Sequence, residues 1–262
     1  MNSAMALEIT EHPAFSEDLY RCGVQSASNL DEHCVQVFLS LPADYPSFHA
    51  GQYIELVLAD GQSRPYSIAN FDPQGRTIEL HIERNWSSST TTAIIDQLQS
   101  QHTIGVKPAQ GDVALRANPS SPLTPQVFLA AGSGFAQVKA LLQHFFHQDQ
   151  QHAGGSYGKA PVYLLWGTDT PAQRYLKVLV RSWLSRYQNL QYRPLNWQQG
   201  DSWEHGLATF IQDCKQAQFY LCGSPSRVYQ TSDYLESQGI ASSQIQSDVF
   251  AYAPRPVQSK SD

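Results

Sequence analysis

Alternating hydrophobic and polar positions dominate the first 117 residues of the chain. They predict strands at 19–24, 33–41, 51–58, 64–70, 77–84, 103–107 and 112–116, separated by turn signals such as Asp60-Gly61. One helix is expected at 91–99, where the hydroxyl side chains of residues 87–90 are available to cap it. Strands at such close spacing are typical of a small antiparallel β-barrel, which we expect to cover residues 1–117.

Short apolar segments alternate with helical patterns in the second half of the chain. We expect strands at 126–131, 161–166, 190–194 and 218–222, and helices at 134–147, 171–187, 205–215 and 225–238. This alternation predicts an α/β domain at 126–252, with a parallel sheet covered by helices on both faces. Three prolines within 118–125 predict a linker, and the polar residues 253–262 predict a flexible tail.

Composition excludes several functional classes. The chain has 262 residues, 41% of them hydrophobic, which is enough for two small cores. Its 17 Lys and Arg against 23 Asp and Glu give a net charge of -6, so the basic surface of a nucleic-acid-binding protein is missing. No apolar run approaches the length of a membrane-spanning helix, and the first residues lack the pattern of a secretory signal. We therefore expect a cytoplasmic protein.

The four cysteines are scattered along the sequence and none of them forms a C-x-x-C pair. Cys22, Cys34, Cys214 and Cys222 are therefore expected to be free thiols. Their spacing also excludes a ferredoxin-type iron–sulfur cluster, which needs four thiolates with three of them close in sequence. If the protein transfers electrons, another cofactor must carry them.

A glycine-rich turn joins an apolar strand to a helix in the second half. In the sequence AAGSGFAQV, Gly132, Ser133 and Gly134 follow the strand and lead directly into the helix. Such a turn exposes unpaired amides at a helix N-terminus, which suits a phosphate or pyrophosphate. The full dinucleotide fingerprint fails because Gln137 stands at the third glycine position, so a plain strand–helix turn is the alternative. Ser133 is outside a G-x-S-x-G motif, which argues against a hydrolase nucleophile.

The segment RPYSIAN at 64–70 carries three chemically useful side chains in the barrel half. Arg64 offers a planar cationic fork, Tyr66 a flat aromatic face and Ser67 a hydroxyl. An ordinary strand with a salt bridge is the alternative interpretation. His144, His147 and His152 invite a metal-site hypothesis, but they lack acidic or thiolate partners and suit a polar helix end, so no metal site is expected.

Taken together, these motifs resemble the ferredoxin-NADP reductase superfamily, and within it the NAD(P)H-flavin reductase branch. The resemblance covers about residues 19 to 252, and R-P-Y-S with C-G-S-P is its most specific combination. The segments that carry it are GQYIELVL (51–58), RPYSIAN (64–70), IELHIER (78–84), AAGSGFAQVKALL (130–142), LLWGTDT (164–170), YLCGSP (220–225) and DVFAY (248–252).

The resemblance implies a flavin-binding barrel and a nicotinamide-binding α/β domain whose two ligand rings stack in the cleft between them. Ser67 would lie near flavin N5, and Cys222 would pack beside the nicotinamide without a covalent role. These two residues are the implied catalytic positions. The implied cofactor-binding positions are Arg64, Pro65, Tyr66, Ser67, Gly132, Ser133, Gly134, Cys222, Gly223, Pro225, Phe250 and Tyr252.

The implied activity is hydride transfer from NAD(P)H to a flavin, FAD or FMN, which is then released reduced or passes its electrons to a separate acceptor. NADH is favoured, because Asp169 would repel the 2′-phosphate of NADPH and Arg174 is the only cation nearby. The segment 86–92 has hydroxyls but no basic residue for a flavin phosphate, and a flavin that is held loosely would be a substrate. The alternatives are an FAD-bound reductase for an iron–sulfur, haem or ferric-chelate partner, and a non-catalytic redox-sensing subunit.

Overall fold

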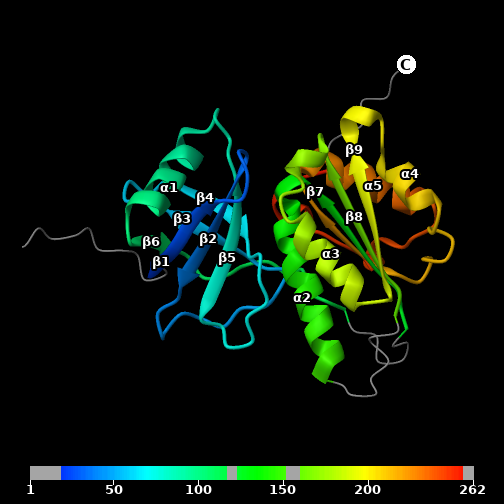
Figure 1. The fold of residues 1–262 in the computed structure, drawn as a ribbon, viewed down its shortest axis with the longest axis horizontal. Helices are drawn as coiled ribbons and strands as arrows, with labels where there is room; N and C mark the ends of the chain where they lie inside the picture. Colours follow the sequence, from blue (N-terminus) through cyan, green and yellow to red (C-terminus); the bar gives the residue numbers. More distant parts are fainter. Residues whose placement is uncertain (1–18, 117–122, 152–159, 256–262) are drawn as a thin grey trace, which may run out of the picture.

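The computed structural model describes residues 19–116, 123–151 and 160–255 of the chain. Its strands form two separate sheets, one in each half of the sequence, which lie side by side in Figure 1. The predicted linker falls partly outside the described residues, and so does most of the predicted tail. No described helix has the length and apolar character needed to cross a membrane.

The N-terminal sheet is antiparallel and has six strands in the order β4-β3-β6-β1-β2-β5. An isolated bridge between Ile68 and Leu80 connects the end of β4 to β5, so the two outermost strands meet and the sheet curls into a barrel. Its apolar interior includes Leu39, Ile54 and Ile82, each fully buried. The strands are β1 (Tyr20–Asn29), β2 (Cys34–Ser40), β3 (Tyr53–Val57), β4 (Ser63–Ser67), β5 (Thr77–Glu83) and β6 (Thr103–Val106).

Helix α1 (Ser89–Ser100) follows β5 and packs against the barrel, as the sequence predicts. Ser88 caps it by accepting a 3.2 Å hydrogen bond from the Thr91 amide, which satisfies one of the free donors of the first turn. Ile94, Ile95 and Leu98 recur at helical spacing and are all buried against the strands. The predicted hydroxyl cap is therefore confirmed.

The strand expected at 112–116 is not formed, and this prediction was wrong. The backbone of this segment bonds to side chains of the second half rather than to another strand: Ala114 exchanges two hydrogen bonds with the side-chain amide of Gln246. The amide of Arg116 donates to the Tyr220 hydroxyl at 3.0 Å. Because these partners satisfy the backbone, the segment stays extended without joining the sheet.

The C-terminal sheet is parallel and has five strands in the order β11-β10-β7-β8-β9, with helices on both faces (Figure 1). One face packs against α2 and α3, and the other against α4 and α5. The strands are β7 (Gln126–Ala131), β8 (Val162–Thr168), β9 (Leu190–Asn196), β10 (Gln218–Cys222) and β11 (Ile245–Gln246). The α-helices are α2 (Phe135–Gln151), α3 (Lys177–Arg186), α4 (Trp203–Ala208), α5 (Pro225–Ser237) and α6 (Val249–Tyr252).

Two of the predicted helices are shorter than their sequence patterns suggest. The pattern at 171–187 divides into a 3₁₀ turn at Pro171–Gln173 and helix α3, because Arg174 leaves the helical conformation with φ -82° and ψ 74°. Helix α4 ends at Ala208, and residues 209–216 continue as turns. The two-residue strand β11 is too short to give a periodic signal and was not predicted.

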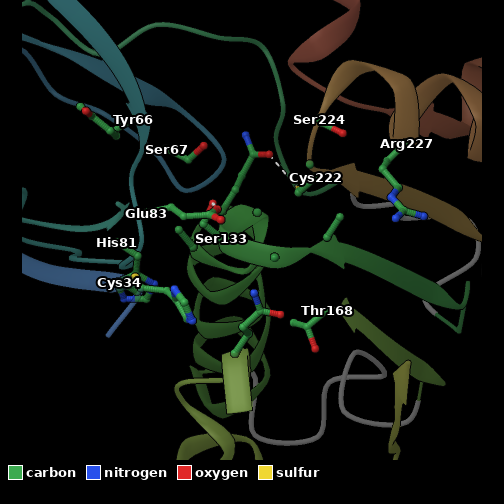
Figure 2. Close-up of a pocket in the computed structure, with 18 of the residues that line it drawn as sticks. Cys34, Tyr66, Ser67, His81, Glu83, Ser133, Thr168, Cys222, Ser224 and Arg227 are labelled. Atoms are coloured by element: carbon green, nitrogen blue, oxygen red, sulfur yellow. Dashed lines mark hydrogen bonds between the residues drawn. The ribbon is translucent and has the colours of Figure 1, made fainter. Parts of the chain in front are cut away.

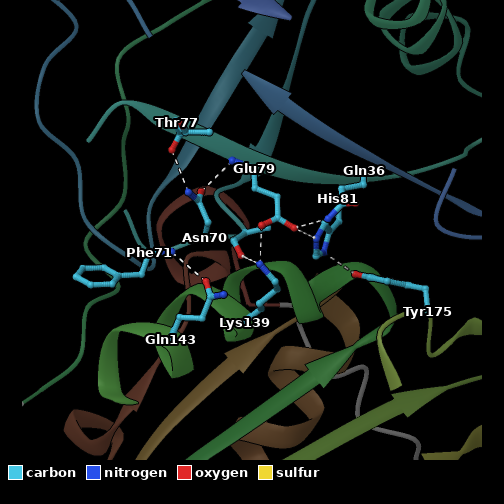
Figure 3. A network of polar contacts seen from close by, with 10 residues as sticks. Gln36, Asn70, Phe71, Thr77, Glu79, His81, Lys139, Gln143 and Tyr175 are labelled. Carbon is cyan, nitrogen blue, oxygen red and sulfur yellow. Dashed lines mark hydrogen bonds and ion pairs between the residues drawn. The ribbon is translucent and has the colours of Figure 1, made fainter. Parts of the chain in front are cut away.

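Helix α2 connects the two halves through buried polar contacts (Figure 3). Lys139 extends from α2 to the barrel, where its Nζ lies 2.6 Å from Glu79 Oε2 and donates to the Ala69 carbonyl at 2.8 Å. Four residues further along, the Gln143 side chain accepts from the Phe71 amide at 3.1 Å. These contacts fix the barrel against the parallel sheet and bring two sets of loop residues to a common face.

Candidate active site

A cavity of about 540 Å³, here called the shared cavity, opens where the two halves meet. Its barrel wall is formed by residues 64–67 of β4 and by His81 and Glu83 of β5. Its opposite wall is formed by the glycine turn after β7 and by the loop after β10. Figure 2 shows Ser67 and Glu83 on one side of the opening and Cys222 on the other.

Most of the site residues inferred from the sequence line this cavity. Two do not: Pro225 begins helix α5, and Phe250 packs at a ring-centroid distance of 5.5 Å against Tyr229. Tyr252, two residues after Phe250, does line the cavity. The predicted positions that line the cavity are Arg64, Pro65, Tyr66, Ser67, Gly132, Ser133, Gly134, Cys222, Gly223 and Tyr252.

The barrel wall presents an unused hydroxyl. Pairing of β3 with β4 sets Tyr53 opposite Ser67 and Ile54 opposite Tyr66. The Tyr66 hydroxyl is buried and makes no hydrogen bond to any described residue. Thr91, which also lines the cavity, uses its own hydroxyl to donate to Ser88 at 3.0 Å. A buried hydroxyl without a partner costs free energy, so this position fits a ligand that carries its own hydroxyl groups, as the side chain of a flavin does.

Close backbone packing shapes the glycine turn. Gly132 has φ +55°, and its carbonyl accepts a 3.0 Å hydrogen bond from the Trp166 indole. A Cβ atom on Gly134 would lie 2.5 Å from the Cys222 carbonyl oxygen, so only glycine permits the loops after β7 and β10 to approach this closely. The turn and the Cys222 loop therefore share one edge of the sheet, at the carboxyl ends of its strands.

Cys222 is held by a bridge that sequence reasoning missed. Its thiol donates to Gln137 Oε1 at 2.8 Å, and Gln137 Nε2 donates to the Gly51 carbonyl of the barrel at 2.6 Å. Burial raises the pKa of the Cys222 thiol well above its usual range, and the nearby Asp248 adds to that shift. The thiol is therefore neutral and a poor nucleophile, which agrees with a packing role.

Asp248 is a lining residue that sequence reasoning missed. It precedes α6, and burial raises the pKa of its carboxyl group. One feature of the sequence could have identified Gln137 and Asp248 as site residues. Each is a polar residue within a segment that carries the resemblance, 130–142 for Gln137 and 248–252 for Asp248. From the sequence, Gln137 stood out only as the break in the dinucleotide fingerprint, and Asp248 did not stand out as a site residue.

A buried ionic network lies behind the barrel wall (Figure 3). Glu79 accepts from Lys139 and, at 2.9 Å, from His81, whose other ring nitrogen lies 3.1 Å from the Tyr175 hydroxyl. Burial by itself would raise the pKa of Glu79, but His81 and Lys139 outweigh it and lower that pKa to about 2. Burial lowers the pKa of His81 despite its contact with Glu79, which favours the neutral imidazole. His81 and Tyr175 also line the cavity.

The hydroxyl of the glycine turn is already hydrogen-bonded to a carboxylate. Ser133 Oγ donates to Glu83 Oε2 at 2.7 Å, which connects the turn to the end of β5. The two side chains are adjacent in Figure 2. An anion that approaches the turn from the cavity therefore meets a negative charge beside Ser133.

The far end of the cavity lies over β8 and β9. Thr168, Asp169, Trp197 and Arg227 line it. Arg174, the cation that the sequence pointed to, is not a lining residue, because its guanidinium donates to Thr168 Oγ1 at 3.0 Å and to a backbone carbonyl at 3.1 Å.

The two described histidines of α2 lie against an aromatic ring. The ring of His144 stacks on Phe71 at 4.4 Å, and His147 lies against the same ring at 5.1 Å. His152 lies outside the described residues. Within the described part of the chain, no group of three or more His, Cys, Asp or Glu side chains could hold a metal ion.

Comparison with known proteins supports the two-part interpretation. A family model described as "Oxidoreductase NAD-binding domain" matches residues 128–232, which contain the glycine turn and the C-G-S-P segment. A reductase component of terephthalate 1,2-dioxygenase from Comamonas sp is 28% identical over 79% of this chain, and the chain spans 60% of that relative's length. A probable flavin reductase from Photobacterium leiognathi is 26% identical over 89% of this chain and 99% of its own.

Among solved structures, a ferredoxin NADP+ reductase from Neisseria gonorrhoeae with bound FAD and NADP shares the fold. It has a TM-score of 0.69 at 18% identity, covering 88% of this chain and 98% of that one. Three findings agree on a two-part reductase. They are the antiparallel sheet followed by a parallel one, the matched NAD-binding domain, and the relative named as a probable flavin reductase. The chain is therefore similar in sequence to flavin reductases and reductase components, and it shares its fold with a ferredoxin-NADP+ reductase.

Proposed function

We propose that this protein is an NAD(P)H-dependent oxidoreductase that reduces a flavin in the shared cavity. The main support for this proposal is that the R-P-Y-S segment of the barrel and the Gly132–Gly134 turn line one cavity together with Cys222. In this proposal, residues 1–117 form the flavin-binding unit, 118–125 the linker and 126–252 the nucleotide-binding unit, followed by the tail at 253–262.

The two ligands would supply the chemistry themselves, namely hydride transfer from the nicotinamide to flavin N5. The protein has to align the two reacting atoms at about 3 to 3.5 Å and exclude water. Tyr66 supplies an aromatic surface on the barrel wall, and Ser67, which also lines the cavity, would offer its hydroxyl to the reacting atom of the flavin. Cys222, neutral and fixed by Gln137, would pack against the nicotinamide from the opposite wall.

We propose further that the flavin is an exchangeable substrate. Hydroxyl groups at the start of α1 were candidates for a flavin phosphate site, but several already have partners within the protein. Thr90 donates to Gln62 at 2.6 Å, Thr91 donates to Ser88 at 3.0 Å, and Thr92 donates to the Ser88 carbonyl. Few groups are left to hold a phosphate firmly, so a riboflavin or FMN molecule can enter and leave.

NADH is the proposed electron donor, as the position of Asp169 suggests. Asp169 lines the far end of the cavity, where its charge opposes a 2′-phosphate. A cytoplasmic location is part of the same proposal. It is compatible with the four buried cysteines, all of them free thiols.

A second candidate function is an FAD-bound reductase that delivers electrons to a separate acceptor. It is favoured by the Comamonas relative, which is named as the reductase component of a dioxygenase system. The acceptor would be an iron–sulfur or haem protein or a ferric chelate. Under this alternative, flavin stays with the protein through many turnovers.

The test is to purify the full chain, record its visible spectrum after gel filtration, and measure NADH oxidation with added riboflavin, FMN, FAD or ferricyanide. A colourless protein that oxidises NADH only when free flavin is present supports the flavin reductase. A yellow protein that reduces ferricyanide without added flavin supports the alternative. Failure to oxidise NADH with every acceptor would refute both functions.

A further inference from the structure

One cation on the nucleotide side of the shared cavity has no role in the proposed hydride transfer. Arg227, in the first turn of α5, lines the cavity. Arg64, the other lining arginine among the described residues, is on the barrel and donates to the Ser63 carbonyl. In Figure 2, Arg227 lies on the far side of Cys222 from Glu83 and Ser133.

A rigid aromatic platform positions the Arg227 guanidinium. Its central carbon lies 4.3 Å from the centroid of the Trp197 ring, within the range of a cation–π contact. The indole packs tightly on the end of β8, since a Cβ atom on Gly167 would lie 1.8 Å from it. Trp203 supports it edge-on at 4.9 Å. Because the ring is fixed, the guanidinium is held over the far end of the cavity.

The charge of Arg227 is not neutralised within the described structure. None of the ion pairs between described side chains includes it, although Asp169 lines the same end of the cavity. At the glycine turn the situation is reversed, because the carboxylate of Glu83 accepts from Ser133. An anionic ligand in this cavity is therefore repelled beside Ser133 and attracted toward Arg227.

We infer that Arg227 binds a phosphate group of the nicotinamide nucleotide. The inference rests on the proposed function and adds a specific nucleotide-binding residue to it. A guanidinium forms charge-assisted, bidentate hydrogen bonds with phosphate oxygens, and its contact with Trp197 pre-organises it for that role. Two phosphate sources share this chemistry: the pyrophosphate of both nucleotides and the 2′-phosphate that only NADPH carries.

The experiment compares Arg227→Met with the wild-type full chain. Dissociation constants for NADH and NADPH are measured by titration calorimetry without flavin, so that no turnover occurs. Arg181→Met is the matched control, because Arg181 is an exposed arginine of α3 that does not line the cavity. Arg227→Lys keeps the charge but removes the planar fork. Circular dichroism spectra and unfolding midpoints confirm that each variant is folded.

Loss of a charge-assisted hydrogen bond to phosphate should raise a dissociation constant about ten- to a hundredfold in Arg227→Met. An equal rise for NADH and NADPH supports contact with the pyrophosphate, and a rise for NADPH alone supports contact with the 2′-phosphate. Arg227→Lys should recover part of the affinity, and Arg181→Met should match the wild type.

Unchanged affinity for both nucleotides in a folded Arg227→Met variant would overturn the inference while leaving the proposed function intact. If the wild-type protein itself binds neither nucleotide, the proposed function is refuted, and the role of Arg227 is refuted with it. The binding measurement therefore distinguishes the two failures.

Discussion

Ser133 and Glu83, fifty residues apart in the sequence, meet across the shared cavity in a 2.7 Å hydrogen bond. Ser133 belongs to the glycine turn of the parallel-sheet half. Glu83 is the last residue of β5, which stands at one end of the strand order in the barrel sheet. The bond holds the two halves together at the position where the sequence alone places a phosphate. A nucleotide that approaches the turn must displace this carboxylate or bind beside it.

Replacing Glu83 by glutamine should tighten nucleotide binding. Two unit charges 4 Å apart in water repel each other by about 1 kcal/mol, which corresponds to about a fivefold lower KM for NADH in Glu83→Gln. Steady-state assays at increasing salt concentration check the cause, because screening should bring wild type and variant together. Glu32→Gln is the control, since Glu32 is exposed and does not line the cavity. A higher KM in Glu83→Gln would show that the carboxylate helps binding.

Removing the Ser67 hydroxyl should slow flavin reduction without weakening nucleotide binding. If this hydroxyl bonds to the reacting flavin atom, Ser67→Ala should lower the rate constant about ten- to a hundredfold. Stopped-flow measurement of flavin reduction at saturating NADH gives that constant directly. Ser63→Ala serves as the control, because Ser63 lies on the same strand but donates to Glu55 at 3.0 Å. An unchanged rate constant in Ser67→Ala would remove Ser67 from the mechanism.

Breaking the buried ion pair between Lys139 and Glu79 should destabilise the fold. Both side chains are almost fully buried and their charged atoms are 2.6 Å apart. Lys139→Met leaves a buried carboxylate without its cation, which typically costs about 3 to 5 kcal/mol. Denaturant unfolding measures the loss. The double variant Glu79→Gln with Lys139→Met should regain part of the stability, and a double variant no more stable than Lys139→Met alone would contradict this account.

The same network predicts a loss of stability in acid. The pKa of Glu79 is lowered from 4.5 to about 2 in the folded protein, so its folded state favours the ionised form. The stabilisation is complete above pH 4.5 and is lost as the pH falls through about 2. Burial also lowers the pKa of His81, so stability that depends on its neutral form starts to fall at higher pH, below 6.5.

Unfolding free energies at a series of pH values separate these contributions. In Glu79→Gln the slope between pH 4.5 and 2 should be shallower than in the wild type, since one carboxylate no longer titrates differently in the two states. Parallel profiles for the two proteins would mean that Glu79 does not contribute to acid sensitivity.

Local patterns in the sequence were sufficient for most of the secondary structure. Period-two alternation predicted β2 and β5, and an apolar run ending in Gly132 predicted β7 and the helix after it. These features depend on near neighbours, which the sequence displays directly. The segment 112–116 was mistaken for a strand because its partners, Gln246 and Tyr220, are more than a hundred residues away.

The sequence alone determined the two-part architecture and the segments that line the shared cavity, because periodicity, turn residues and motifs are properties of short stretches of chain. Tertiary structure alone decided which side chains meet there. Gln137 joins Gly51 to Cys222, and Arg227 rather than Arg174 lines the cavity. Such contacts depend on how α2 packs against the barrel and how loops from different strands converge at one sheet edge. No local pattern encodes those distances.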